Sequence, residues 1–301
     1  MKILLENVNT SSTSGPNHFG NKLKKYMEKL EHKFVLSNPD IRLCFIESQY
    51  PKNEVPMVQR LDGIYFNKKF DFEKQNSNIL KTYENSKGVI FQTEFNKRLT
   101  FQYFGYHDNH TVIRNGADLE LISTIKPLQN NVLDSYERVW CSASSWRPHK
   151  RLNENIKYFL ENSSEKDCFV IAGEVNNKIS HPRIYYAGNL GISTLMSLYK
   201  RADFFVHLAW LDHCPNVVVD ARACGCKIIC SSSGGTKEIA GKDAIVIAEP
   251  EWDLSPTDLY NPPRIERWLE TKARQEAYSS IDMVDVAGEY SNFLEKVYEN
   301  N

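Results

Sequence analysis

Short apolar runs alternate with amphipathic stretches along the whole chain. A short apolar run that ends at a turn is typical of a buried parallel strand, and apolar positions three and four residues apart are typical of a helix. The alternation therefore favours an α/β protein with mostly parallel sheets. In the first part of the chain, we predict strands over residues 3–5, 41–46, 88–91 and 111–113, and helices over residues 19–30 and 79–83.

The pattern pauses once and then starts again. Residues 123–134 show no clear period and contain a proline and two consecutive asparagines, so we predict a linker there. After it we predict strands over residues 138–143, 168–172, 184–187, 204–206 and 227–230, and helices over residues 153–160, 193–199, 216–224 and 282–298.

These two series predict two doubly wound domains. The first covers residues 1–122 and the second residues 135–281. Residues 282–301 are expected to form a C-terminal helix with apolar residues available to pack back toward the first domain. A length of 301 residues agrees with two domains of about 150 residues each.

Charge and hydropathy exclude several classes of protein. The net charge is −1, from 37 Lys and Arg against 38 Asp and Glu, so no basic excess indicates nucleic acid or an anionic membrane. No segment offers about 18 consecutive apolar residues, and the first apolar run is too short for a signal peptide. We therefore expect a cytoplasmic protein without an integral membrane segment.

Three of the seven cysteines lie close together in the sequence. Cys224, Cys226 and Cys230 raise the question of a zinc site, but no histidine is interleaved at ligand spacing. Free cysteine is among the most buried residue types. Core packing is the favoured interpretation, and no metal site is predicted.

The most informative segment, residues 207–226, follows the strand predicted at 204–206. A helix is expected to open at about Pro215, because proline is favoured at the first helical position, where its missing N–H costs nothing. The amides of Asn216 and Val217 would then point at a phosphate oxygen.

The same segment carries two carboxylates, Asp212 and Asp220, separated by seven residues. A carboxylate near a helix start can accept hydrogen bonds from two vicinal hydroxyls. The alternative is that Asp212 is a surface loop acid and Asp220 only complements the positive end of the helix. The two residues alone leave both interpretations open.

A second strand-end loop, residues 142–152, concentrates Arg147, Lys150 and Arg151. Cations of this kind neutralise the charge that develops on a departing diphosphate. The alternative, a solvated helix start, is weakened because cations at a helix N-terminus oppose the helix dipole.

A third loop, residues 230–241, contains Gly234 and Gly235, which allow the backbone to approach a ligand closely. A Gly-Gly pair by itself usually marks only a turn. All three loops follow predicted strands, and ligands of open α/β sheets bind beyond the carboxyl ends of the strands.

In order and spacing, the three loops resemble the C-terminal half of glycosyltransferase family four, retaining enzymes of the GT-B fold that belong to the glycosyl transferases group 1. The first half of the chain is similar to that family in SGPNHFG (14–20), RLDGIYF (60–66), VIFQTEF (89–95) and VIRNGAD (112–118). The resemblance implies an α/β protein of GT-B type, with two Rossmann-like doubly wound domains facing a cleft. The C-terminal domain would bind the donor, and the N-terminal domain the acceptor.

The resemblance also implies roles for the two carboxylates. The family's pair of glutamates, with seven residues between them, reads Asp212 and Asp220 here. Asp220 would bind the ribose of the nucleotide and Asp212 the transferred sugar, with the Asn216 and Val217 amides on the distal phosphate. Each aspartate is shorter than glutamate by one methylene, which leaves the contact geometry open.

Lys150 matches the lysine of the family's G-R-x-x-x-x-K segment, but the arginine does not match. Its position falls on Ser145, so Arg147 is a candidate by chemistry and Arg151 a weaker one. In this fold the nucleotide base is contacted largely by backbone groups, which are expected at Gly173, Gly188, Asn189 and Leu190.

In the N-terminal half, residues 14–20 resemble the family's glycine-rich loop between the first strand and the first helix. His18 is a catalytic candidate there, although a lone histidine is more often structural or at the surface. The acceptor-side candidates are Gly15, Asn17, Gly20 and Asp62.

The sequence thus predicts a retaining glycosyltransferase that moves a hexose from a UDP-, GDP- or ADP-sugar to a hydroxyl acceptor, without a metal or another cofactor. The acceptor would be a glycan, a lipid-linked molecule or a small molecule, and a lipid-linked acceptor would bring peripheral membrane contact. A catalytically degenerate nucleotide-sugar-binding module and a GT-B epimerase or phosphorylase stay as alternatives. A nicotinamide dehydrogenase is disfavoured because no G-x-G-x-x-G follows the first strand.

Overall fold

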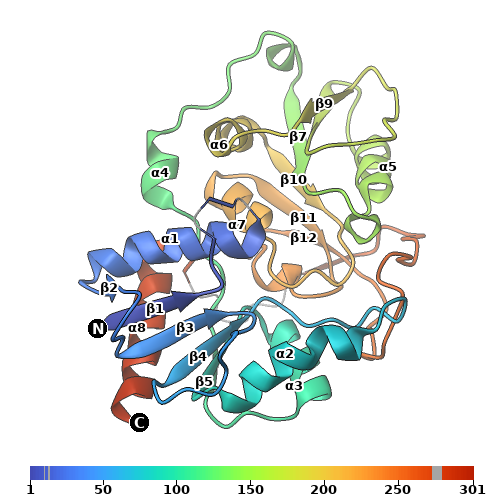
Figure 1. Cartoon of the computed structure of the whole chain (residues 1–301). Helices are drawn as coiled ribbons and strands as arrows, with labels where there is room; N and C mark the ends of the chain where they lie inside the picture. Colours follow the sequence, from blue (N-terminus) through green and yellow to red (C-terminus); the bar gives the residue numbers. More distant parts are fainter. Residues whose placement is uncertain (10, 13, 273–279) are drawn as a thin grey trace. The chain divides into compact units, whose positions relative to one another are not determined.

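A computed structural model describes residues 1–9, 11–12, 14–272 and 280–301 (Figure 1). It divides into two compact units. The first unit contains Met1–Ala117, Asp253–Thr257 and the C-terminal end of the chain. The second contains Asp118–Trp252 and the segment that follows from Asp258.

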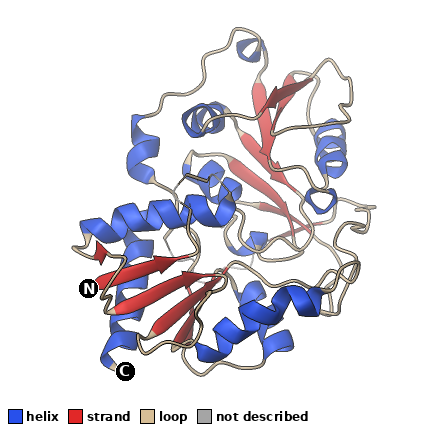
Figure 2. Ribbon diagram, in the orientation of Figure 1, coloured by secondary structure: helices blue, strands red, loops and turns tan. Residues whose placement is uncertain are grey.

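The first unit is built on a six-stranded sheet of order β2-β1-β3-β4-β5-β6 (Figure 2). All its strand pairs are parallel, so the carboxyl ends of the strands meet at one edge. The strands are β1 (Lys2–Glu6), β2 (Lys33–Phe34), β3 (Ile41–Phe45), β4 (Met57–Leu61), β5 (Gly88–Phe91) and β6 (His110–Val112). The helices are α1 (Gly15–Lys29), α2 (Phe72–Asn85), α3 (Glu94–Phe104) and α8 (Met283–Glu299).

Helices cover both faces of this sheet, as the alternation along β4 shows. Val58 joins the apolar cluster formed with α1 and α8, whereas Gln59 points to the opposite face and donates a hydrogen bond to the carbonyl of Ile79 in α2. The C-terminal helix α8 packs beside α1, with the rings of Phe19 and Tyr290 5.9 Å apart (Figure 1). The last helix of the chain is therefore part of the core of the first unit.

The second unit is built on a seven-stranded sheet of order β13-β12-β11-β10-β7-β8-β9, in which only the edge strand β13 is antiparallel. The strands are β7 (Arg138–Ala143), β8 (Asp167–Ala172), β9 (Ile184–Gly188), β10 (Phe204–His207), β11 (Lys227–Ser231), β12 (Ile245–Ile247) and β13 (Glu270–Lys272). The helices are α4 (Leu119–Thr124), α5 (Leu152–Asn162), α6 (Ile192–Arg201) and α7 (Asn216–Ala223), with short 3₁₀ turns at Leu133–Ser135, Pro148–Lys150 and Thr236–Glu238. Because β11, β10 and β7 are neighbours, the loops that leave their carboxyl ends lie together.

The boundaries of the units differ from those predicted. The division falls between Ala117 and Asp118, not near residue 122. The stretch predicted as a linker runs along α6, where the amide of Leu128 donates to the carbonyl of Ser197, and belongs to the second unit. Residues 253–257, expected in the second domain, belong to the first, where the hydroxyl of Tyr103 donates to the carbonyl of Leu254.

Strand β4 was not among the predicted strands. Its sequence, MVQRL, places Gln59 and Arg60 between apolar residues, and both polar side chains are fully buried. Polar residues inside a strand interrupt the apolar run on which strand prediction depends. In the structure, the amide nitrogen of Gln59 and the guanidinium of Arg60 donate hydrogen bonds inside the protein, so the strand can stay in the core.

The cysteines are free thiols, and all but the half-buried Cys224 are buried. In the described ranges, no group of three or more His, Cys, Asp or Glu residues could hold a metal ion. None of the described helices is long and apolar enough to cross a membrane.

Candidate active site

The loops at the carboxyl ends of β7, β10 and β11 meet around Asp212. The Oδ2 atom of Asp212 accepts hydrogen bonds from Lys150 Nζ at 2.5 Å and from His207 Nε2 at 2.9 Å. Its backbone carbonyl accepts from the amide of Gly235 at 2.8 Å. The fold thus joins three loops whose candidate residues were predicted independently.

Gly234 is required by a close approach within the protein. Its φ is +75°, and a Cβ atom at this position would come within 2.5 Å of the carbonyl oxygen of Asp212. The close backbone approach expected from the Gly-Gly pair is therefore made to the Asp212 loop.

The charge of Asp212 is balanced by Lys150 and not by the neighbouring histidines. Burial lowers the pKa of His149 to about 3 and that of His213 to about 4, so both imidazoles are neutral at neutral pH. Burial also lowers the pKa of His207, against the pull of Asp212. Burial disfavours ionisation of Asp212, but Lys150 and the hydrogen bond from His207 outweigh it and hold its pKa well below the usual range. Asp212 is therefore ionised and Lys150 is its counter-ion.

Lys150 keeps donors to spare. A lysine ammonium has three N–H groups, and among the described residues only Asp212 accepts from this one. The side chain is 18% exposed. Lys150 is thus oriented by one hydrogen bond and can still reach an anionic ligand with the others.

His207 is a further candidate site residue, which the sequence analysis did not single out. It is the last residue of β10, is almost fully buried, and places its ring against the Asp212 carboxylate. Its Nδ1 atom has no hydrogen-bond partner in the part of the chain that the structure describes. The available signal was a histidine that closes a buried apolar strand, directly before the Asp212 loop.

Helix α7 starts next to this cluster. Pro215 is its N-cap residue and not its first helical residue, so the helix begins one position later than the proline signal predicted, and among the described residues no side chain caps it. Asn216 and Val217 form the start of the first turn and are half-buried. Asp220 lies one turn further on and is 6% exposed. Burial raises the pKa of Tyr199 in α6, and the nearby Asp220 adds to this rise.

The structure does not support the assignment of Arg151 to the donor. Its guanidinium forms two hydrogen bonds with the Glu249 carboxylate, at 2.7 and 2.8 Å, and a third with the carbonyl of Pro263. Both side chains of the pair are buried. Arg151 also adopts a left-handed backbone conformation (φ 52°), which directs the start of α5. The arginine is an internal structural cation, whereas Arg147, four residues earlier, is exposed.

The residues expected near the nucleotide base lie at the carboxyl ends of β8 and β9. The amide of Gly173 donates to the carbonyl of Gly188 at 2.7 Å, so that amide is already used. A Cβ atom on Gly173 would collide with the carbonyl of Ser144, which explains the glycine. Asn189 is exposed and Leu190 half-buried.

In the first unit, residues 15–20 form the first turns of α1 and not a loop, which corrects the prediction. Ser14 occupies the N-cap position and a proline the first turn, both of which favour an early helix start. Asn17 accepts a hydrogen bond from the amide of Asn9, and Gly20 packs against Val8, where a Cβ atom would not fit. Gly15 is exposed at the first position of the helix, and His18, in its first turn, is half-buried.

Asp62 directly follows the carboxyl end of β4. Its carboxylate forms an ion pair with the fully buried Arg60 and accepts a hydrogen bond from Gln92, which directly follows β5. The side chain is 15% exposed. This places Asp62 at the edge of the sheet where ligands of α/β domains bind.

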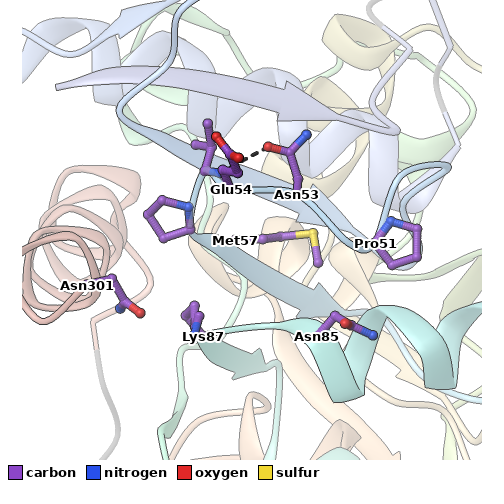
Figure 3. A pocket seen from close by; sticks show the side chains of 9 residues that line it. Pro51, Asn53, Glu54, Met57, Asn85, Lys87 and Asn301 are labelled. Carbon is purple, nitrogen blue, oxygen red and sulfur yellow. Dashed lines mark hydrogen bonds between the residues drawn. The ribbon is translucent and has the colours of Figure 1, made fainter.

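A pocket of about 170 Å³ lies elsewhere in the first unit (Figure 3). Met57, the first residue of β4, lines it together with Lys87, which directly precedes β5. It therefore opens at the amino ends of the strands, opposite to the edge that carries Asp62. None of the predicted site residues lines this pocket.

Comparisons with known proteins agree with this architecture. The structure is similar over 100% of both chains to sucrose-phosphate synthase from Thermosynechococcus elongatus (TM-score 0.73, 10% identity). It is similar over 98% of this chain and 100% of the other to Anabaena HepE in complex with UDP-glucose (TM-score 0.70, 15% identity). A glycosyltransferase from Rickettsia africae gives a TM-score of 0.64 at 15% identity, covering 100% of this chain and 99% of the other. The search of curated proteins finds no match.

These likenesses and the two parallel-rich sheets define the class: the chain has the GT-B fold of glycosyltransferases. Within it, residues 138–255 match the family described as Glycosyl transferases group 1. That range begins at β7 and contains Lys150, His207, Asp212 and Asp220. The candidate site of the second unit thus lies inside the range that this family model matches.

Proposed function

We propose that the protein is a retaining glycosyltransferase of family four, which transfers a hexose from a nucleoside diphosphate sugar to a hydroxyl acceptor. The second unit binds the donor, and the acceptor side of the reaction belongs to the first unit. The proposal is supported by the family match over residues 138–255 and by the fold. The complex of Anabaena HepE with UDP-glucose favours a nucleotide sugar as the donor.

The observation that carries the proposal is the Lys150–Asp212–His207 cluster beside the start of α7. A diphosphate leaving group gains negative charge as the glycosidic bond breaks, and fixed donors aimed at it lower the barrier. Lys150 is such a donor, because Asp212 orients its ammonium and leaves N–H groups available. The exposed side chain of Arg147 supplies a second cation.

The carboxylates have distinct tasks in this scheme. Asp212 accepts three hydrogen bonds, from Lys150, from His207 and from the amide of His213. A carboxylate offers about four acceptor positions, so one is left for a hydroxyl of the transferred sugar. Asp220, on α7, binds the ribose hydroxyls, and the backbone at residues 188–190 contacts the base. At the acceptor side, Asp62 meets the incoming hydroxyl.

A thermal-shift panel of UDP-, GDP- and ADP-sugars tests the proposal. A donor at 100 times its dissociation constant is expected to stabilise the protein by about 2.7 kcal/mol. The shift and the release of nucleotide with an acceptor are expected to be the same in excess EDTA, because fixed cations and amides hold the diphosphate. Loss of turnover in EDTA that manganese restores would contradict the metal-independent scheme, and no shift with any donor would contradict the function.

Asp220→Ala is expected to weaken donor binding by about 1.5–3 kcal/mol, the range for hydrogen bonds to a charged group. The carboxylate would grip the ribose in the ground and transition states alike, so kcat at saturating donor should change little. Isothermal titration with the donor from the panel measures the effect.

Glu154→Ala is the matched control, since Glu154 is a carboxylate near the start of another helix of the second unit: it lies in the first turn of α5, and Asp220 lies just beyond the first turn of α7. It should leave the affinity unchanged. If Asp220 only complements the dipole of α7, both variants would lose some stability and neither would lose affinity.

A further inference from the structure

A buried cation stands behind Asp62 in the first unit. Arg60 is fully buried in β4, and its guanidinium lies 4.2 Å from the ring centre of Phe19 and 4.7 Å from that of Phe45. The rings of Phe19 from α1 and Phe45 from β3 thus flank the cation. A charge kept at this depth needs a partner for each of its donors.

Three different segments provide those partners. Arg60 Nη1 donates to Asp62, Nη2 donates to Asn115 Oδ1 at 2.7 Å, and Nε donates to the hydroxyl of Tyr290 at 2.9 Å. Asn115 follows β6, and Tyr290 lies on the C-terminal helix α8, 230 residues away in the sequence. The guanidinium plane is therefore fixed from three directions.

Among the described residues, only one of the two oxygen atoms of the Asp62 carboxylate has hydrogen-bond partners. Asp62 Oδ1 accepts from both Arg60 and Gln92, whereas Asp62 Oδ2 is buried without a hydrogen-bond partner among the described residues. An unpaired buried carboxylate oxygen is costly, so a missing donor is expected there. Because Arg60 already balances the charge of Asp62, a neutral hydroxyl suits the position better than an ammonium group.

We propose that Arg60 positions Asp62 to accept a hydrogen bond from a neutral hydroxyl of the acceptor, and that Tyr290 makes the C-terminal helix part of the acceptor site by holding Arg60. The inference rests on the proposed function and assigns its acceptor side. Arg60 and Tyr290 act through Asp62 and do not touch the acceptor themselves.

Tyr290→Phe tests the proposal with the loss of one oxygen atom. Nucleotide release is measured with the donor found in the thermal-shift panel, and with methyl α-D-glucopyranoside, methyl α-D-mannopyranoside and methyl β-D-galactopyranoside as acceptor probes. Without the hydroxyl, Arg60 Nε loses its acceptor and the guanidinium can turn away from Asp62. The KM for the active glycoside should rise about tenfold, while the donor dissociation constant keeps the parent's value and kcat stays within about twofold.

Tyr83→Phe is the matched control. Tyr83 is a buried tyrosine of the same unit whose hydroxyl also makes a 2.9 Å hydrogen bond, to the carbonyl of Gly105. A purely structural effect of losing a buried hydroxyl should appear equally in both variants, whereas the rise in KM should appear only in Tyr290→Phe. If Tyr290→Phe does not fold, Asp62→Asn is measured instead, since it removes the Oδ2 acceptor without changing the volume and should raise the same KM at least tenfold.

The outcomes separate this inference from the function. A parent that binds no donor overturns the proposed function and this inference with it. If the parent binds donor and hydrolyses it, but none of the three glycosides raises the rate of nucleotide release, the proposal that Asp62 binds an acceptor hydroxyl is contradicted. If the parent uses a glycoside and Tyr290→Phe keeps its KM, only the positioning role of Arg60 and Tyr290 is overturned.

Discussion

Lys150→Ala is expected to lower kcat by on the order of a hundredfold or more, beyond any loss of donor affinity. The ammonium is held by Asp212 at 2.5 Å, and its remaining N–H groups can bind the phosphate oxygens. Its attraction for those oxygens grows as negative charge builds on the leaving diphosphate. The interaction is therefore stronger in the transition state than in the ground state, which is the condition for an effect on turnover. Nucleotide release at saturating donor and acceptor measures it.

The variant should remain folded, because Asp212 keeps its hydrogen bonds from His207 and from the amide of His213. Circular dichroism at neutral pH checks this before the kinetics are compared. Lys227→Ala is the matched control. Lys227 is exposed at the first position of β11, at the amino ends of the strands of the same sheet, whereas Lys150 follows the carboxyl end of β7. The loss of Lys227 should leave kcat within about twofold. A parent-like kcat in Lys150→Ala would remove Lys150 from the reaction.

Arg151→Ala should lower the free energy of unfolding by about 3–5 kcal/mol, the usual cost of removing one partner of a buried ion pair. The side chains of Arg151 and Glu249 are 1% and 6% exposed. Without the guanidinium, the Glu249 carboxylate stays buried with only the hydroxyl of Ser231 and local groups near it, and the Pro263 carbonyl loses its donor. Urea unfolding followed by circular dichroism measures the loss.

A control and a double variant separate charge burial from general disturbance. Lys166→Ala breaks an exposed ion pair with Glu137 and should have no measurable effect on stability. Arg151→Ala combined with Glu249→Gln should be more stable than Arg151→Ala alone, because the buried negative charge is then gone. If Arg151→Ala instead keeps its stability and loses donor affinity, the arginine belongs to the donor site after all.

Much of the fold follows from the sequence because its signals are local. An apolar run or a helical period depends only on neighbouring residues, and the strands at 88–91 and 138–143 have the predicted bounds. The loops of the second unit were recognisable because Lys150, Asp212 and Asp220 stand at fixed spacings after strands. Where local signals conflict, as in the buried polar residues of β4, prediction failed.

What each charged residue does was decided only by the tertiary structure. Lys150 and Arg151 are neighbours in a basic loop, yet Lys150 turns to Asp212 and Arg151 to Glu249, 98 residues away. Likewise, Arg60 donates a hydrogen bond to Tyr290, which is far away in the sequence. His207 contacts the Asp212 carboxylate because the loop between them folds back. Sequence alone determined the elements that have a clear local pattern and the chemical groups that stand at their ends. Long-range packing decides which groups come within hydrogen-bond distance of a buried charge, and therefore whether that charge is paired within the protein or available to a ligand. A buried charge needs such a partner, because burying it unpaired costs several kcal/mol of folding free energy, on the order of the whole stability of a domain.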